Sequence, residues 1–165
     1  MPWHGVEKLR DFAGSFPDII IDVLGYGTFP DGLPSPKNMR FYGYQNGEKY
    51  ENILKDADAA IGSISLHLNG MQEASPFKVR DYAARGIPCI LPYKDTDLSE
   101  VDCDEILNIP NTLDNLNTHG EQIHDFIMRM RGKRLDRSKF SNRINIRNKE
   151  KQRVDFFNII LKANQ

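Results

Sequence analysis

Two carboxylates eight positions apart, Glu73 and Asp81, stand in the stretch EASPFKVRDYAARGIPCI at residues 73–90. Glu73 comes just before a predicted helix, where a negative charge gains from the helix dipole. Asp81 lies within that helix, where a salt bridge to Arg85 or Lys78 would explain it. A helix N-terminus also offers free amide hydrogens to an anion such as a phosphate. The two acids would then accept hydrogen bonds from hydroxyl groups on either side of that anion.

The helix between the two acids has clear signals at both ends. Pro76 has no amide hydrogen and suits the first helical position, so Ser75 is the expected N-cap. We expect a helix over residues 77–85. Its sheet-facing residues are predicted to be Phe77, Ala83 and Ala84, and the residues that end it are Gly86 and Pro88. A diphosphate at its N-terminus would lie beside Lys78, and a phosphate between two hydroxyl-rich rings describes a nucleotide sugar.

Composition and charge indicate one globular domain. The 165 residues are 39% hydrophobic and 27% charged, which is typical of a folded protein with a buried core. The net charge of −1 gives no global attraction to nucleic acid, so we expect no such partner. Arginine and lysine are frequent in the last third of the chain. We interpret them as a solvated face, with contact to a membrane surface as the alternative.

The two cysteines, Cys89 and Cys103, form neither a zinc motif nor a disulfide framework. Cys89 lies in an apolar run and is predicted to be buried. This cysteine usage is typical of a reducing compartment, so we expect a cytoplasmic protein. Since no apolar run approaches the roughly 20 residues that span a bilayer, any membrane association would be peripheral, at the inner face.

Apolar runs alternate with amphipathic stretches along the chain. Strands are expected at residues 19–24, 39–44, 58–68, 87–92 and 105–110. Helices are expected at residues 5–14, 47–57 and 77–85, within 112–131 and at 147–163, the last with Val154, Phe157 and Leu161 at core spacing. This alternation predicts one α/β domain over residues 1–165, a Rossmann-like parallel sheet with helices on both faces, closed by a C-terminal helix at 147–165. Ligands of such folds bind beyond the carboxyl ends of the strands. The functional loops are therefore expected at residues 25–28, 43–47, 67–75 and 92–97.

The acidic pair belongs to a longer pattern. It reads Glu73, seven residues, Asp81, the helix end YAAR and the strand entry GIPCI. This pattern resembles the signature of retaining, nucleotide-sugar-dependent glycosyltransferases of the GT-B fold, the group 1 or family 4 type. Four further stretches resemble that family in the same order, namely WHGVEKL, IIIDVLGYG, MRFYGY and DADAAIGSISLH. The resemblance covers nearly the whole chain as the C-terminal, donor-binding domain of such an enzyme.

The resemblance implies transfer of a hexose from a nucleotide diphosphate sugar to a glycan or glycoconjugate acceptor. Glu73 would bind hydroxyls of the donor sugar as the catalytic carboxylate, and Asp81 would bind the ribose. The other donor-binding residues that it implies are Ala74, Ser75, Pro76, Phe77, Gly25, Gly27, Gly43 and Tyr44. Lys78 would partly replace a basic pair that grips the diphosphate, and His67 is either a donor contact or a structural histidine. Neither a metal nor another cofactor is expected.

The chain departs from the family in three respects. The second acid is aspartate rather than glutamate, which shortens the reach of Asp81 by one methylene. Only the second residue of the family's basic pair has a counterpart in this chain, Lys8, and no arginine stands at the first position. We find neither the strand that precedes the family's entry motif nor the N-terminal domain that binds a glycan or lipid-linked acceptor. We therefore expect this chain, as a monomer, to bind nucleotide weakly and to transfer no sugar by itself.

Two other functions are left open. A Rossmann-like module would bind a nucleotide or nucleotide sugar without chemistry and keep the same acidic pair. A flavodoxin-like receiver or interaction domain needs an acidic pocket after the first strand, where DVLGYGTF offers glycines instead. Gly25 and Gly27 are otherwise explained as ordinary turn glycines.

Overall fold

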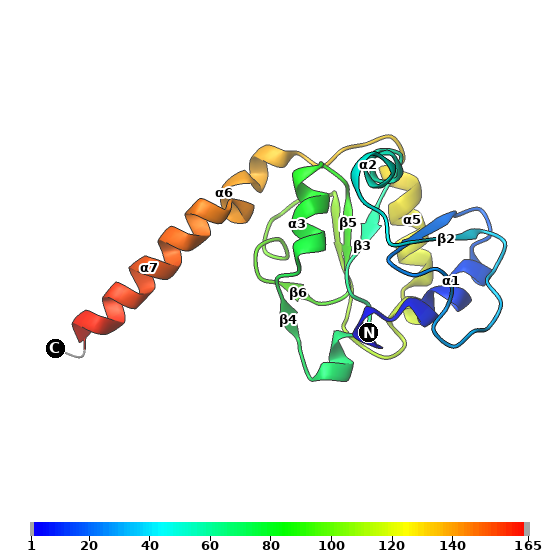
Figure 1. Cartoon of the computed structure of the whole chain (residues 1–165), viewed down its shortest axis with the longest axis horizontal. Helices are drawn as coiled ribbons and strands as arrows, with labels where there is room; N and C mark the ends of the chain where they lie inside the picture. The colour runs from blue at the N-terminus through cyan, green and yellow to red at the C-terminus, as the bar shows by residue number, and fades with distance from the viewer. Residues whose placement is uncertain (1, 164–165) are drawn as a thin grey trace.

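The computed structural model describes residues 2–163 and has a Rossmann-like α/β architecture in which the recorded strand pairs are parallel (Figure 1). Its strands are β1 (Ile21–Leu24), β2 (Met39–Gly43), β3 (Ala60–Ile61), β4 (Glu73–Ala74), β5 (Cys89–Leu91), β6 (Lys94–Asp95) and β7 (Ile106–Asn108). Its α-helices are α1 (Leu9–Ser15), α2 (Gly47–Lys55), α3 (Phe77–Ala84), α4 (Asn115–Thr118), α5 (Gly120–Met130), α6 (Ser141–Ile144) and α7 (Ile146–Ala163). Short 3-10 helices lie at Pro2–His4, Val6–Lys8, Leu66–Asn69 and Arg137–Lys139. The predicted fold class is confirmed.

The strands form three separate ladders within residues 2–163. β1 pairs with β2, the order of the largest sheet is β3-β5-β7, and β4 pairs with β6. The β4–β6 pair is not visible as strands in the sequence, because each partner is only two residues long. In the described part of the chain, β1 has no recorded partner besides β2, and β3 has none besides β5. The five strands that we predicted as one sheet therefore form two ladders, β1-β2 and β3-β5-β7, with no pairing between β1 and β3 among the described residues.

β5 lies between two hydrophobic clusters, as expected for a parallel strand that is buried on both faces. Ile90 belongs to the cluster that includes α1 and α5, whereas Cys89 and Leu91 belong to the cluster that includes α3. The α3 side chains of that second cluster, Val79 and Ala83, are fully buried. Helices therefore cover both faces of this sheet, and the predicted burial of Cys89 is confirmed.

The third predicted strand, residues 58–68, is reduced to the two residues of β3. The chain approaches its neighbours closely at Gly62, where a Cβ would come within 2.7 Å of the Tyr93 ring. Beyond this glycine, the amide of Ile64 donates to the carbonyl of His4 rather than to a neighbouring strand. The apolar pattern after β3 thus reflects burial of side chains such as Ile64 in the core, not ladder pairing.

The start of α3 differs from the prediction. Pro76, not Ser75, is the N-cap residue, and the Ser75 hydroxyl donates instead to Asp97 Oδ2 at 3.3 Å. Phe77 is 90% exposed, so its predicted packing on the sheet is wrong. Ala84 is also exposed, because the helix face that contacts the sheet is the one that carries Val79 and Ala83.

The tail forms the predicted helix, α7, which projects away from the other elements (Figure 1). The side chains expected at core spacing, Val154, Phe157 and Leu161, are 55%, 55% and 64% exposed. Lys149 joins the first turns of α7 to Asp97 through a contact of 2.5 Å. The helical apolar pattern therefore does not mark contact with the core here. Within the described part of the chain, no helix is both long and apolar enough to cross a bilayer.

Candidate functional site

The N-terminus of α3 offers unpaired backbone donors at the carboxyl edge of the sheets. Among the described residues no side chain caps this helix, because its N-cap residue is Pro76, which has no side-chain acceptor. The amide of Val79 donates to the Pro76 carbonyl at 3.2 Å. The amides of Phe77 and Lys78, two and one positions earlier, have no acceptor within the helix, as at any helix start. Two amide hydrogens and the positive end of the helix dipole are thus free to meet an anion.

Lys78 is a half-buried cation at this helix start. Burial lowers the pKa of its ammonium to about 8. Within residues 2–163 its side chain has no recorded hydrogen bond or ion pair with a carboxylate. The pKa of His4 is also lowered, first by burial and then by the charge of Lys78. Because a buried charge is costly until an opposite charge joins it, Lys78 is the group at this edge best suited to an anionic ligand.

Glu73 lies ahead of α3, as predicted, in strand β4 and opposite Lys94 of β6. Its Oε1 accepts a hydrogen bond from Lys94 Nζ at 2.8 Å, and both side chains are about half exposed. An exposed ion pair of this kind contributes little to stability, so it can open easily. Glu73 would therefore have to exchange its partner in order to bind a ligand hydroxyl.

Asp81 is part of a bridge between α2 and α3. Tyr50 donates its hydroxyl hydrogen to Asp81 Oδ2 at 2.6 Å, and Arg85 Nε donates to Oδ1 at 3.0 Å. Arg85 also pairs with Glu51 of α2. The intrahelical salt bridge considered from the sequence is confirmed, whereas the Tyr50 contact joins residues 31 positions apart and has no sequence signal. Each carboxylate oxygen still has a lone pair that a ligand hydroxyl can use.

The glycines after β1 and β2 form a paired turn. Gly25 and Gly43 adopt left-handed conformations with φ of 90° and 65°, and the Gly25 amide donates to the Gly43 carbonyl at 2.7 Å. Apart from chain neighbours, no atom of the residues described lies within 4 Å of a Cβ built at Gly25, Gly27 or Gly43. Tyr44, next in the chain, is 83% exposed. Gly25 and Gly43 therefore act as turn glycines that permit a positive φ, and the space beside all three glycines is open.

His67 lies in the 3-10 helix Leu66–Asn69 and is held by Asn111. Its amide donates to Asn111 Oδ1 at 3.1 Å, and its Nδ1 lies 3.2 Å from the same oxygen. Its Nε2 is buried without a recorded partner among the residues described. The contacts with Asn111 favour the structural interpretation of this histidine.

A buried ion-pair network at the same edge was not predicted. Arg80 of α3 donates to Asp95 at 2.5 Å and also to Asp97, and Asp95 is fully buried. Burial would raise the pKa of Asp97, but hydrogen bonds from Lys149 and Arg80 hold it below the usual value. The only sequence signal is the pair of acids in the KDTD run after the fourth strand. This network is closed on itself, so it positions α3 and α7 instead of binding a ligand.

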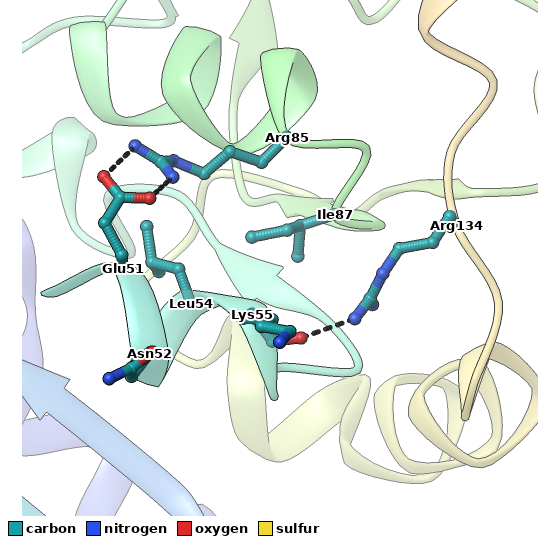
Figure 2. Close-up of a pocket in the computed structure, with 7 residues that line it drawn as sticks. All are labelled: Glu51, Asn52, Leu54, Lys55, Arg85, Ile87 and Arg134. Atoms are coloured by element: carbon teal, nitrogen blue, oxygen red, sulfur yellow. Dashed lines mark hydrogen bonds and ion pairs between the residues drawn. The ribbon is translucent and has the colours of Figure 1, made fainter. Parts of the chain in front are cut away.

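A cavity of about 300 Å³ lies at the opposite end of α3, and Figure 2 shows the residues that line it. It is lined by Glu51, Asn52, Leu54, Lys55, Arg85, Ile87 and Arg134. Arg85 pairs with Glu51, and Arg134 donates to the Lys55 carbonyl at 2.6 Å (Figure 2). Since Ile87 precedes β5, this cavity lies at the amino ends of the strands, away from the predicted site. Its two arginines are already paired, so we do not assign a ligand to it.

Neither a metal site nor similarity to a known protein indicates the function of this chain. Among residues 2–163 there is no group of three or more His, Cys, Asp and Glu side chains that could hold a metal ion. Neither a family model, nor a curated protein, nor a solved structure matches the chain. A functional conclusion therefore depends on the residues around the N-terminus of α3.

Proposed function

We propose that this chain is the donor-binding domain of a retaining glycosyltransferase and binds a nucleotide diphosphate sugar beside the N-terminus of α3. The observation that carries the proposal is Lys78, a half-buried ammonium whose pKa is lowered to about 8 and which stands next to two unpaired helix amides. A diphosphate would supply the charge that this group lacks. The sequence pattern around Glu73 and Asp81 supports the same ligand.

The donor would be held by three kinds of contact. The amides of Phe77 and Lys78 would bind diphosphate oxygens, and the Lys78 ammonium would neutralise their charge. Glu73 would leave Lys94 and accept hydrogen bonds from the sugar hydroxyls, while Lys94 became free to approach a phosphate. Asp81 would accept a ribose hydroxyl while it keeps its bonds to Tyr50 and Arg85.

The same contacts would serve the chemical step. As the hexose leaves for the acceptor oxygen, negative charge grows on the departing diphosphate, and fixed dipoles and an ammonium stabilise that charge. Exclusion of water requires a second domain to close over the donor. The proposal therefore places the acceptor, a glycan or lipid-linked sugar, on that second domain. It predicts that this chain alone binds nucleotide and transfers no sugar.

A binding module without chemistry is the second candidate, and one observation favours it. Both carboxylates of the acidic pair are already engaged, Glu73 with Lys94 and Asp81 with Tyr50 and Arg85. A module would need only the phosphate contacts at Lys78 and would leave both acids in these structural bonds. The two candidates therefore differ in whether a carboxylate contributes to sugar affinity.

Calorimetric titration separates the two candidates. A nucleoside diphosphate and its hexose derivative are titrated into the full chain and into Glu73→Gln and Asp81→Asn. If the chain is a donor-binding domain, Glu73→Gln weakens binding of the sugar nucleotide several-fold and leaves the plain nucleotide unchanged, while Asp81→Asn weakens both. Equal affinities for all variants would support the module. Absence of binding by every nucleotide, with inorganic diphosphate also inert, would refute both.

A further inference from the structure

The first turns of α7 are anchored to the fold, whereas its far end is exposed. Just ahead of α6, Phe140 is fully buried in the cluster that includes α3, and Ile144 packs against the same cluster. Lys149 then contacts Asp97 Oδ1. From there α7 projects away from the other elements, and every residue over 154–162 is exposed (Figure 1). Residues 154–162, called here the far end of α7, therefore stand clear of the rest of the fold.

The far end of α7 is mostly apolar although it is exposed. Its exposed apolar residues are Val154, Phe156, Phe157, Ile159, Ile160 and Leu161. The polar ones, Asp155, Asn158 and Lys162, are three and four positions apart and therefore share one stripe of the helix. At about 100° per residue, the apolar side chains cover an arc of about 220° around the remaining surface. A contiguous exposed apolar surface of this kind marks a place where a protein meets a partner or a membrane.

The segment that carries α7 is strongly basic. Residues 129–163 contain twelve Lys and Arg against three Asp and Glu, whereas residues 1–128, called here the body, contain ten against twenty. Among the described residues, no salt bridge involves the exposed cations Lys133, Arg137, Lys139, Arg147 and Lys162. The chain as a whole is nearly neutral, but its charges are thus separated between a basic α7 segment and an acidic body.

An anionic lipid surface matches both properties of α7. Helices with a broad apolar face and with Lys and Arg on the polar face lie in the plane of a bilayer, where acyl chains cover the apolar side chains and lipid phosphates attract the cations. A lysine in the polar stripe, such as Lys162, reaches the headgroups while its methylenes stay in the apolar layer. The acidic body is repelled by the same surface, so the basic segment is the part that meets it.

A second copy of the chain matches these properties less well. A helix that pairs with one other helix buries a stripe that is narrower than the apolar arc of α7. One partner helix would therefore leave Val154 or Ile159 uncovered, because they lie at the two margins of the arc. Pairing of two α7 helices would also bring two basic segments together, whereas anionic headgroups neutralise them. The observations therefore favour a lipid surface over a dimer.

We propose that the far end of α7 docks on the surface of a membrane that contains anionic lipids, with Phe156, Phe157 and Leu161 among the acyl chains and Lys162 at the headgroups. The helix lies along the surface and does not cross the membrane, because residues 147–153 carry charged side chains on all sides of the helix. The anchored first turns of α7 hold the body beside the membrane without burying it. This inference does not depend on the proposed function.

Titration of the full chain with lipid vesicles, followed by flotation, tests this inference. One vesicle sample is phosphatidylcholine, and the other also contains about one third phosphatidylglycerol. We expect the wild type to bind the anionic vesicles at least about ten-fold more tightly than the neutral ones, and more weakly in high salt, because salt screens the attraction. The double variant Phe156→Ser/Phe157→Ser should weaken binding to the anionic vesicles at least about ten-fold. Lys162→Gln should weaken it about five-fold.

The matched control is Leu33→Ser/Leu113→Ser, which removes two exposed apolar side chains from the acidic body. It should bind the anionic vesicles as tightly as the wild type does. Circular dichroism without vesicles verifies that each variant is folded, as expected because all the replaced side chains are exposed.

Three results would overturn the inference. Equal affinity of the wild type for neutral and anionic vesicles, or binding to neither, would mean that α7 does not recognise an anionic surface. An equal loss of binding in Leu33→Ser/Leu113→Ser and in Phe156→Ser/Phe157→Ser would mean that the far end of α7 is not the contact. A wild-type dimer in sedimentation equilibrium that Phe156→Ser/Phe157→Ser dissociates would assign this face to a second copy. No nucleotide enters these measurements, so their failure is distinct from a failure of the proposed function.

Discussion

Lys78 and Arg80 are two cations two residues apart on α3, and they lie in opposite environments. Arg80 lies between Asp95 and Asp97 and donates hydrogen bonds to both. Lys78 has no recorded carboxylate partner in the part of the chain that the structure describes, and burial lowers its pKa to about 8. One helix turn therefore carries a cation whose charge is neutralised within the fold and another whose charge is not.

The difference separates structural from ligand-binding charge at this edge. A cation that is buried with its partners stabilises the position of α3, and its removal leaves charges behind without compensation. A cation that is buried without a partner costs stability until a ligand arrives. The variants below test whether the two cations behave as this comparison requires, in order of decreasing expected effect.

The largest effect is expected for Arg80→Met. It leaves the buried Asp95 carboxylate without a cation and Asp97 with Lys149 alone, so the free energy of unfolding should fall by about 3–5 kcal/mol in urea titrations. Arg80→Lys is the matched control, because it keeps the charge and loses the two-pronged geometry, and its loss should be smaller. A loss below about 1 kcal/mol for Arg80→Met would mean that the network is not structural.

Lys78→Met should instead stabilise the chain at pH 7, by up to about 3 kcal/mol. Between about pH 8 and the usual lysine pKa of 10.5, the unfolded chain holds a proton that folded Lys78 has released. Stability of the wild type should therefore rise with pH across this window, and the advantage of Lys78→Met should disappear by its upper end. Urea titrations from pH 7 to 10.5 measure both curves. A destabilised Lys78→Met at pH 7 would show that Lys78 has a partner within the fold.

Tyr50→Phe should have a moderate effect, a loss of about 1 kcal/mol, because it removes one hydrogen bond to the Asp81 carboxylate. Tyr44→Phe is the matched control: its side chain is 83% exposed, and its stability should not change. Thermal unfolding of both variants measures the difference. Equal stability for Tyr50→Phe and the wild type would mean that the hydrogen bond between Tyr50 and Asp81 does not stabilise the fold.

The smallest effect is expected for Arg153→Met on α7. Arg153 pairs with Glu150 at 2.8 Å on an exposed helix, where water and salt screen the attraction. Unfolding of this variant should coincide with that of the wild type within error. A clear loss of stability would mean that α7 contributes to the fold through contacts that the exposed pair does not suggest.

Local signals account for the parts of the fold that sequence predicts well. Gly86 has φ of 73° and ends α3 as expected, and β1 and β2 lie within their predicted apolar runs. The reduction of the third strand could not be predicted, because beyond Gly62 the Ile64 amide donates to the carbonyl of His4, which is 60 positions away in the sequence. The apolar spacing in α7 led to a wrong prediction of burial. Helical periodicity indicates which side chains share one face of a helix, but it does not indicate whether another element covers that face.

The elements around the candidate site could be predicted from the sequence, whereas most of the side-chain contacts within it could not. The start of α3, Glu73 and Lys78 lie together around one edge of the sheets, as their order in the sequence suggested. Sequence spacing revealed the bond of Asp81 to Arg85 at i+4, because both lie on one helix. It could not reveal that the Tyr50 hydroxyl donates to Asp81, or that the Ser75 hydroxyl donates to Asp97 instead of capping α3. Those partners come from other elements of the fold.

Titration of UDP, GDP and ADP into the full chain, Lys78→Met and Lys49→Met tests the central claim most directly. Lys49→Met is the matched control, because it removes an exposed lysine from α2. We predict that one of the three nucleotides binds, that Lys78→Met weakens this binding at least ten-fold, and that Lys49→Met changes it less than two-fold. Unchanged binding by Lys78→Met, or binding of none of the three nucleotides to the wild type, would contradict a diphosphate site at the N-terminus of α3.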